Sequence, residues 1–392
     1  MVKRSIALAS VLVVMLAAAC GRLYDSNQRT LGWRAPGEPR LMSFVLDNAV
    51  FQFTSPTAVT RTAIPLARNS GSIAAPLSAG TSPVAQLSPD ETTLVFSTWR
   101  YFGNPPTAED PPPSTGMRVA HPAVHAFDLA SGTDRVFADG AISPVVSTAG
   151  DVAFVKGDMP DYYANQPFTG TIQVQSLTSV EPSTLVSASD NYRLVGWAGD
   201  NLLYYVQSEG EVLDLYAMSV GGGARLLAEG AGVIAISPDR TSVLVQRVGT
   251  TESDLALIDI ASGQLLTRAA NIAAPDGSEV GALQMRGDWL GDRVVASGVT
   301  FAGIVYLQVS DSGIGLEGVQ DLGDAKYPMG VEAPRFSEDG TSVVSQAVIP
   351  PQTASDTPHA EVITCSGIES PCASVVPEPG FVGAAYSIGH VE

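Results

Sequence analysis

Histidine is the first residue type to consider for acid–base or metal chemistry, and the chain has four, at positions 121, 125, 359 and 390. None lies beside a candidate nucleophile in a recognisable motif, and no serine stands in a G-x-S-x-G turn. His121 and His125 are four residues apart, a spacing that would let both bind one metal from a helix face. Pro122 and the pattern HAFDL favour a strand instead, in which the two residues would lie about 13 Å apart. The sequence therefore predicts no catalytic histidine and no histidine metal site.

Aspartate recurs in short turns between apolar segments, at positions 90, 200, 239, 292 and 339. A calcium site would need six or more oxygens from converging loops, and the chain contains no D-x-D-x-D-G segment. An aspartate in a β-turn bonds its own backbone, which explains the repetition without an ion. Residues 221–223 are three glycines that lack the Lys-Ser/Thr and the helix of a phosphate loop, so we expect a hairpin turn. We expect no cofactor.

Two cysteines, Cys365 and Cys372, lie close together between strand-like segments. In an oxidising compartment such a pair is most simply a disulfide across a hairpin. A zinc site would need four ligands, and further cysteine or histidine ligands are missing nearby. The sequence therefore predicts a Cys365–Cys372 disulfide.

The chain is strongly acidic, with 21 Lys and Arg against 40 Asp and Glu and a formal net charge of −19 over 392 residues. Such a surface repels phosphate backbones, which argues against nucleic acid as a partner. Solubility alone accounts for much of this charge. With 45% apolar residues, the chain has enough hydrophobic content for a large core.

Residues 1–19 have the layout of an exported signal segment, with Lys3 and Arg4, a short apolar run and small residues before Cys20. The segment resembles the lipobox of bacterial lipoproteins, although Ala17 stands where leucine is more usual. The resemblance implies that Cys20 is acylated, that residues 20–40 are a flexible tether, and that the protein is anchored in the cell envelope through lipid only. An ordinary secretory signal, in which Cys20 is incidental, is the alternative.

A repeat of four short β-type segments dominates the rest of the chain and is clearest at residues 232–268, where strands are expected at 233–236, 242–246, 254–260 and 264–266. Six turns with an acidic residue, at positions 90, 151, 200, 239, 292 and 339, follow at steps of 61, 49, 39, 53 and 47 residues. Each copy carries a second hairpin, and long amphipathic helical patterns are missing after the signal segment. These features predict an all-β fold of repeated four-stranded sheets around a centre.

The copies resemble the repeat of TolB-type (WD40-like) β-propellers, whose blades open with a Ser-Pro-Asp-Gly turn. The residues that carry the resemblance are Ser88-Pro89-Asp90, Ser237-Pro238-Asp239 and Ser337-Glu338-Asp339-Gly340. The resemblance implies a propeller fold and protein partners, and it implies no reaction.

The two ends of the chain determine the expected number of blades. Residues 41–47, 50–54 and 58–64 predict three strands, followed by a connector at 69–82. Residues 381–387 predict one more strand, the innermost of another blade, with nothing following to complete that blade. Joining these segments closes the ring by strand exchange between the termini and removes open sheet edges. We therefore expect one domain over residues 41–392 with seven blades; six blades with an irregular cap are the alternative.

Three connections between second and third strands are enlarged, at residues 99–120, 157–170 and 349–360. In a closed ring these loops would lie in one sector of one face. Their aromatic and acidic residues have the composition of a recognition surface. The alternative is that the aromatic residues fold back over the disc. The candidate binding face consists of Trp99, Tyr101, Phe102, Asp110, Asp158, Asp161, Tyr162, Tyr163 and Phe168.

These features favour a non-enzymatic scaffold that binds a protein or peptide, with a basic surface as the natural complement to the acidic loops. The alternatives are carbohydrate binding by the same loops, or an enzyme acting on a sugar or lactone at the central channel. An enzyme would need several inward-facing acidic or histidine side chains. The expected innermost strands, among them residues 282–285, are mostly apolar, which argues against channel chemistry.

Overall fold

The computed structural model describes residues 41–46, 49–55, 58–63, 72–73, 85–90, 92–101, 120–157, 168–207, 213–247, 254–270, 272, 283, 287–298, 303–310, 313–322, 331–337, 340–349, 359–375 and 389–391. These residues form strands and turns, and they contain no helix that could cross a membrane. The predicted signal segment (1–19) and tether (20–40) lie outside them.

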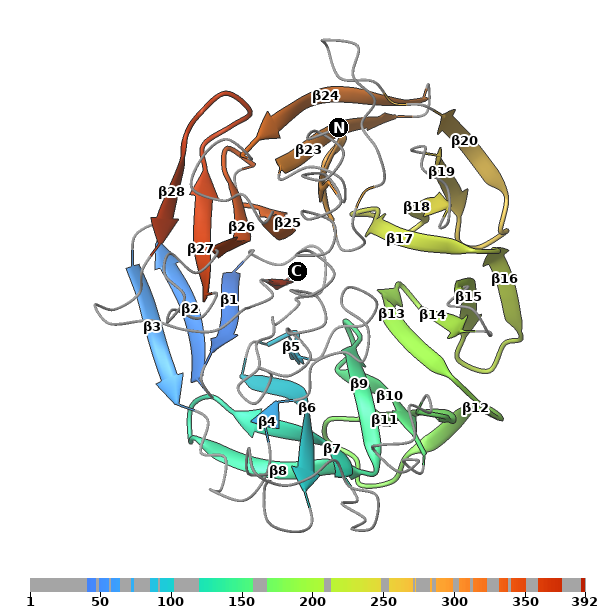
Figure 1. Cartoon of the computed structure of the whole chain (residues 1–392). Coiled ribbons are helices and arrows are strands. Elements are labelled where there is room, and N and C mark those ends of the chain that lie inside the picture. The colour runs from blue at the N-terminus through green and yellow to red at the C-terminus, as the bar shows by residue number, and fades with distance from the viewer. Residues whose placement is uncertain are drawn as a thin grey trace, which may run out of the picture.

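The strands form seven antiparallel sheets in the described part of the chain, arranged around a common centre (Figure 1). Sheet I contains β4 (Ser72–Ile73), β5 (Ala85–Leu87), β6 (Thr93–Tyr101), β7 (Ala120–Asp128) and β8 (Thr133–Asp139). Sheet II contains β9 (Ala141–Val146), β10 (Asp151–Lys156), β11 (Gly170–Ser176) and β12 (Ser183–Asp190). Sheet III contains β13 (Tyr192–Ala198), β14 (Asn201–Gln207), β15 (Leu213–Ser219) and β16 (Ala224–Ala228).

The other four sheets repeat this order from the centre outward. Sheet IV contains β17 (Ala231–Ile236), β18 (Ser242–Arg247), β19 (Asp254–Asp259) and β20 (Leu265–Ala270). Sheet V contains β21 (Asp288–Leu290), β22 (Arg293–Ser297), β23 (Gly303–Ser310) and β24 (Gly313–Asp321). Sheet VI contains β25 (Val331–Phe336), β26 (Val343–Ile349), β27 (His359–Cys365) and β28 (Cys372–Val375). Sheet VII contains β29 (Gly389–Val391), β1 (Leu41–Leu46), β2 (Ala49–Ser55) and β3 (Ala58–Ala63).

The predicted all-β propeller is confirmed, and the repeat at residues 232–268 is sheet IV. Sheet VII combines both ends of the described chain, because β29 pairs with β1 through Val391 opposite Leu41 and Gly389 opposite Ser43. This is the strand exchange that the sequence predicted. β29 covers the inner edge of β1, which would otherwise be free to pair with another chain.

Three strand predictions need correction. The connector at 69–82 contains a short strand, β4. Both β4 and β5 pair with β6 on its inner side, and β4 pairs with the part of β6 that follows the part paired with β5. The innermost strand of sheet V is β21, whereas Leu283, in the segment expected there, makes only an isolated bridge to Gly298. The closing strand β29 follows the predicted segment 381–387, which lies outside the described residues. In each case a segment of a few residues was too short for periodicity to locate it.

The repeated acidic turns hold the first two strands of a sheet together. In sheet IV, Ser237 Oγ donates to Asp239 Oδ1 at 2.6 Å and accepts from the Ser242 amide at 2.9 Å. The Thr241 amide also donates to Asp239 Oδ1, at 3.1 Å. The Ser237 hydroxyl bond, opposed by partial burial, lowers the pKa of Asp239. Sheet I repeats these bonds with Ser88 and Asp90, so Asp90 and Asp239 form turns, as predicted; Asp339 lies outside the described residues.

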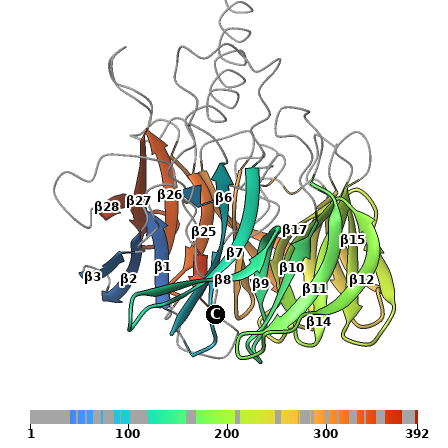
Figure 2. The ribbon, with the colours of Figure 1, turned by 90° about the horizontal axis from the view of Figure 1, so that it is seen from below.

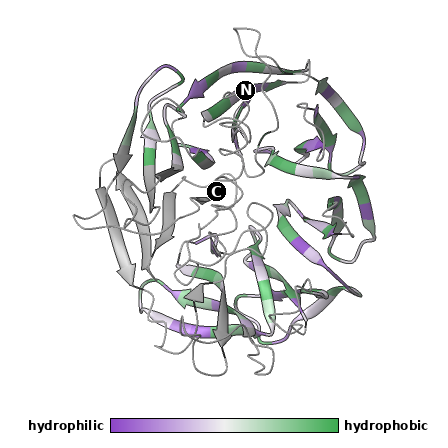
Figure 3. Cartoon of the chain, viewed as in Figure 1, coloured by the Kyte–Doolittle hydropathy of each residue, from purple (hydrophilic) through white to green (hydrophobic). Residues whose placement is uncertain are grey.

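The hydrophobic core is divided into clusters that lie between neighbouring sheets. One cluster joins Leu203 and Leu215 of sheet III to Val233 and Val243 of sheet IV. Hydrophobic segments recur on the coloured strands of sheets II to V (Figure 3). The second strands of sheets II, III and IV bury both faces, since five consecutive residues of β18 and four each of β10 and β14 are buried. This double burial explains why their sequences are apolar runs rather than alternating patterns.

Polar side chains on second strands satisfy backbone amides of the neighbouring sheet. Ser97, Tyr205 and Gln246 are each the fifth residue of their strand, in β6, β14 and β18. Their side-chain oxygens accept from the amides of Ser143, Val233 and Leu283, at 3.0, 2.6 and 2.7 Å. A buried amide without an acceptor would be destabilising, so each bond supports the contact between two sheets.

Arginines make a second kind of link between sheets, by donating to main-chain carbonyls. The bonds run from Arg135 to Leu177 (2.9 Å), Arg225 to Ile260 (3.0 Å), Arg240 to Trp197 (2.8 Å) and Arg335 to Gly287 (2.6 Å). The first bond joins sheets I and II, the second and third both join sheets III and IV, and the fourth joins sheets V and VI. Hydrogen bonds from a charged donor are stronger than neutral ones, so these links tie neighbouring sheets together.

The predicted disulfide is present between Cys365 and Cys372, with an S–S distance of 2.02 Å. The two cysteines face each other in register at the ends of β27 and β28. It closes the last hairpin of sheet VI.

Candidate functional site

The stems of the three long connections open on one face of the disc. They follow β6, β10 and β26, each the second strand of its sheet, and end at β7, β11 and β27. In a ring of equivalent sheets, connections between second and third strands lie on the same side. Figure 2 shows the ends of β6, β7, β26 and β27 at one edge.

The sheets that carry these stems, VI, I and II, lie in one sector of the ring, with sheet VII between VI and I. β25 of sheet VI lies beside β29 of sheet VII, β29 beside β5 of sheet I, and β5 beside β9 of sheet II. The stems therefore occupy the consecutive sector VI, VII, I and II (Figure 1). We call the loop-bearing side of this sector the loop face.

Most of the predicted binding residues lie in the long connections, outside the described residues: Phe102, Asp110, Asp158, Asp161, Tyr162 and Tyr163. Trp99 and Tyr101 belong to β6, where their backbones pair with Pro122 and Ala120 at the stem of the first loop. The role of these residues in binding stays a prediction.

Phe168 was wrongly predicted to belong to the exposed binding face. Its exposed fraction is 1%, and it packs in the core between sheets II and III. The same cluster contains Tyr192, Trp197 and Tyr204 of sheet III. Phe168 stands two residues before β11, so it already belongs to the sheet contact and is covered by its neighbours. It supports the loop stem and is not available to a partner.

Two glycines form the base of the loop in sheet II. A Cβ atom on Gly157 would lie 2.1 Å from the carbonyl oxygen of Thr169, and one on Gly170 would lie 2.3 Å from that of Lys156. Neither distance is compatible with a side chain, so glycine is required where the strands leave and re-enter the sheet. This close approach fixes the stem of the segment that contains Asp158, Asp161, Tyr162 and Tyr163.

A row of tyrosines crosses sheet III beside this stem. The rings of Tyr192 and Tyr204 meet edge to face with centroids 5.6 Å apart, and those of Tyr204 and Tyr216 stack at 5.7 Å. Burial, with smaller effects from the neighbouring tyrosines, raises the pKa of Tyr204 to about 12. The apolar run at residues 202–206 is typical of a strand but does not reveal this row, because the three tyrosines are brought together only by strand register.

Polar residues of the innermost strands are used in contacts between sheets. Gln86 Oε1 accepts from the Val146 amide, linking sheets I and II. Asp288 Oδ2 accepts from the Phe336 amide at 2.9 Å, linking sheets V and VI. Both side chains are buried, and these bonds assign them a structural role. The described inner strands thus provide bonds that join sheets rather than an assembled set of reacting groups.

His121 and His125 both lie in β7, so the prediction of a strand at this position is confirmed. His125 is 1% exposed, its Nδ1 lies 2.9 Å from Asp134 Oδ2, and its ring stacks on Phe96 at 5.4 Å. Within the described residues, no group of three or more histidine, cysteine or acidic side chains is arranged to hold a metal ion.

Comparison with known proteins bears on the fold. No protein-family model and no curated protein sequence matches the chain. An oligogalacturonate lyase in complex with manganese is similar at a TM-score of 0.51 and 11% identity, covering 90% of each chain. A prolyl endopeptidase has a TM-score of 0.50 and 15% identity; the match covers 92% of this chain and 52% of the peptidase. TolB from Acinetobacter baumannii has a TM-score of 0.39 and 13% identity, covering 72% of this chain and 69% of TolB.

Proposed function

We propose that the protein is a non-enzymatic scaffold of the cell envelope that binds a protein or peptide through the loop face. The observation that carries this proposal is the position of the three long-loop stems in four consecutive sheets. Long connections in a compact domain are uncommon unless they have a function. A rigid ring that presents adjacent loops is the arrangement by which scaffolds position binding residues.

The composition of the loops supports a partner with a basic or mixed surface. The loops combine aromatic residues with acidic ones, and the whole chain has a net charge of −19. Aromatic residues supply contact area at a low entropic cost, and the charge accelerates encounter with a basic partner. The partner is therefore expected to bind faster at low salt than at high salt.

The double variant Tyr162→Ala/Tyr163→Ala is expected to weaken partner binding at least about tenfold, because aromatic anchors contribute most of the energy of an interface. Cross-linking in intact cells identifies the partner, and its affinity for the purified variant and the unchanged chain is then measured. Val180→Ala is the matched control, since Val180 is 89% exposed but lies in the hairpin between β11 and β12, away from the loop face. Equal affinity of the double variant and the unchanged chain would exclude these tyrosines of the 157–170 loop as binding anchors.

The alternative is carbohydrate binding by the same loops, or an enzyme that acts on a sugar or lactone. The observation that keeps this alternative is the fold shared with the oligogalacturonate lyase over 90% of the chain. A glycan array separates the two. Retention of an oligosaccharide that is lost in the Tyr162/Tyr163 variant, or its turnover, would favour the alternative over a protein partner.

The proposal includes attachment to a bacterial membrane through acylated Cys20, with the ring held on the tether of residues 20–40. The support is the arrangement of charged, apolar and small residues before Cys20. Cells fed a clickable palmitate analogue are expected to label the unchanged chain, while Cys20→Ser loses the label and leaves the membrane fraction. If the Cys20→Ser chain is still labelled, Cys20 is not the anchor.

A further inference from the structure

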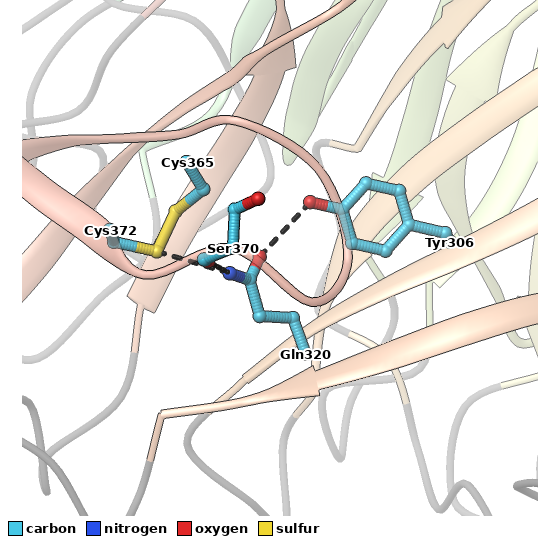
Figure 4. Close-up of a disulfide and its surroundings, with 5 residues drawn as sticks. All are labelled: Tyr306, Gln320, Cys365, Ser370 and Cys372. Atoms are coloured by element: carbon cyan, nitrogen blue, oxygen red, sulfur yellow. Dashed lines mark hydrogen bonds between the residues drawn. A yellow bond between two sulfur atoms is a disulfide. The ribbon is translucent and has the colours of Figure 1, made fainter.

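The disulfide-closed hairpin of sheet VI is held against the outer strand of sheet V. Gln320 Nε2 of β24 donates to the carbonyl oxygen of Ser370 at 2.6 Å and lies 3.4 Å from Cys372 Sγ. The hydroxyl of Tyr306 donates to Gln320 Oε1 at 3.1 Å and so fixes the amide (Figure 4). A single glutamine therefore contacts both the hairpin backbone and one sulfur of the disulfide.

Ile368, at the centre of the hairpin, packs directly on Gly318. A Cβ atom at Gly318 would lie 2.9 Å from Ile368 Cδ1, closer than side chains approach one another. The hairpin thus lies on a strip of β24 that has no side chain at this point. Gly318 and Gln320 of sheet V thus contact the hairpin of sheet VI. Opening the disulfide would loosen these contacts.

The two sulfurs have different surroundings. Cys365 is 0% exposed and lies in the hydrophobic cluster that contains Val295, Tyr306 and Ile363. Cys372 is partly exposed at the edge of the same cluster, and it receives the N–H of Gln320. Thiol–disulfide exchange requires access for a thiolate, and a nearby N–H donor stabilises a sulfur anion. Only Cys372 meets both conditions.

We propose that this disulfide is a thiol-exchange site whose substrate is a dithiol, with Cys372 as the exchanging cysteine and Cys365 as the resolving one. The inference does not depend on the proposed binding function, because it concerns the opposite end of β27 from the loop stem. Opening the disulfide would nevertheless affect the loop stem, because β27 runs from the loop at His359 to the disulfide at Cys365.

The reaction balances with the dithiol as reductant. One thiolate of the dithiol attacks Cys372 Sγ and forms a mixed disulfide, while the bond to Cys365 breaks and Cys365 leaves as a thiolate that takes up a proton. The second thiolate of the dithiol then attacks the dithiol sulfur that is bonded to Cys372, and Cys372 leaves as a thiolate that takes up a proton. The products are an oxidised cyclic or protein disulfide and two thiols in the hairpin. In the reverse direction, Cys372 attacks the partner's disulfide and Cys365 resolves the adduct.

Single-cysteine variants trap the intermediate. Full-length Cys365→Ser and Cys372→Ser are each incubated with oxidised glutathione, and peptide mass mapping measures the mixed disulfide at the remaining hairpin cysteine. Cys365→Ser is expected to form the adduct on Cys372 about tenfold faster than Cys372→Ser forms it on Cys365, because thiol reactivity follows exposure and thiolate character. Equal rates, a faster adduct on Cys365, or no adduct on either cysteine would overturn the assignment.

The unchanged protein provides a second measurement if a variant fails to fold. Reduced glutathione, as a monothiol, attacks the intact disulfide but cannot release the mixed disulfide by an intramolecular step, so early alkylation traps the adduct before a second glutathione or Cys365 attacks it. The adduct is expected on Cys372 and the alkyl group on Cys365, with hydrogen-exchange protection lost in residues 359–375 and 313–321 and retained in sheets III and IV. An adduct on Cys365, or reduction only after the whole ring has unfolded, would contradict the proposal.

Discussion

Replacing Arg335 by alanine is expected to lower the free energy of unfolding by about 3–5 kcal/mol. Arg335 is fully buried, and its Nη1 donates to the carbonyl oxygens of Gly287 at 2.6 Å and Pro334 at 3.1 Å. Alanine removes one of the links between sheets V and VI, leaves the buried Gly287 carbonyl without this donor, and opens a cavity where the buried side chain stood. Urea denaturation followed by tryptophan fluorescence measures the loss.

Two further variants separate the causes of this effect. Arg335→Met keeps most of the side-chain volume but not the donor, so it is expected to recover the part of the stability that packing supplies. Arg268→Ala also removes an arginine, but this side chain is 54% exposed and pairs with Asp254 at the surface, where water screens the ion pair, so the expected loss is much smaller. If Arg335→Ala costs no more than Arg268→Ala, the buried link does not stabilise the ring.

Phe168→Ala is expected to destabilise the protein by about 3–5 kcal/mol, the usual cost of removing a buried aromatic ring. Phe168 is 1% exposed and packs between sheets II and III with Tyr192 and Tyr204. Thermal unfolding of the variant, followed by circular dichroism, measures the loss. Partner binding at a temperature where the variant is folded is expected to change much less than in the Tyr162/Tyr163 variant.

Val180→Ala again serves as the control, with an expected change within about 0.5 kcal/mol, because Val180 is 89% exposed. The opposite result would be a Phe168→Ala protein of unchanged stability that no longer binds its partner. That outcome would return Phe168 to the binding face and contradict its place in the core.

The sequence was sufficient for features that depend on local chemistry. Ser237-Pro238-Asp239 predicts a turn because serine and aspartate side chains bond to residues close to them in sequence; in the structure the Ser237 and Asp239 side chains bond within five residues of themselves. The hairpin between β27 and β28 was predictable for the same reason, since Cys365 and Cys372 are close in sequence and the disulfide joins them. Regular spacing of such turns is enough to predict repeated sheets around a centre.

Features that depend on contacts between distant segments were missed. The fifth residues of β6, β14 and β18 are Ser97, Tyr205 and Gln246, three different chemical types with one role. Only the register of neighbouring sheets shows that each of these side chains lies opposite a backbone amide to which it offers an acceptor. Phe168 was misplaced for a similar reason. It is close to Tyr162 in sequence, but its side chain packs in the core between sheets II and III. The sequence signal that was available is a polar residue inside an otherwise apolar second strand.

The arginine links between sheets have a consequence for how such a chain can evolve. Their acceptors at Leu177, Ile260, Trp197 and Gly287 are main-chain oxygens, a group that every amino acid possesses. A mutation of the receiving residue therefore leaves the acceptor atom in place, and only the donor side is under chemical constraint. Copies of the repeat are free to diverge until they hardly resemble one another while the ring they build keeps its shape.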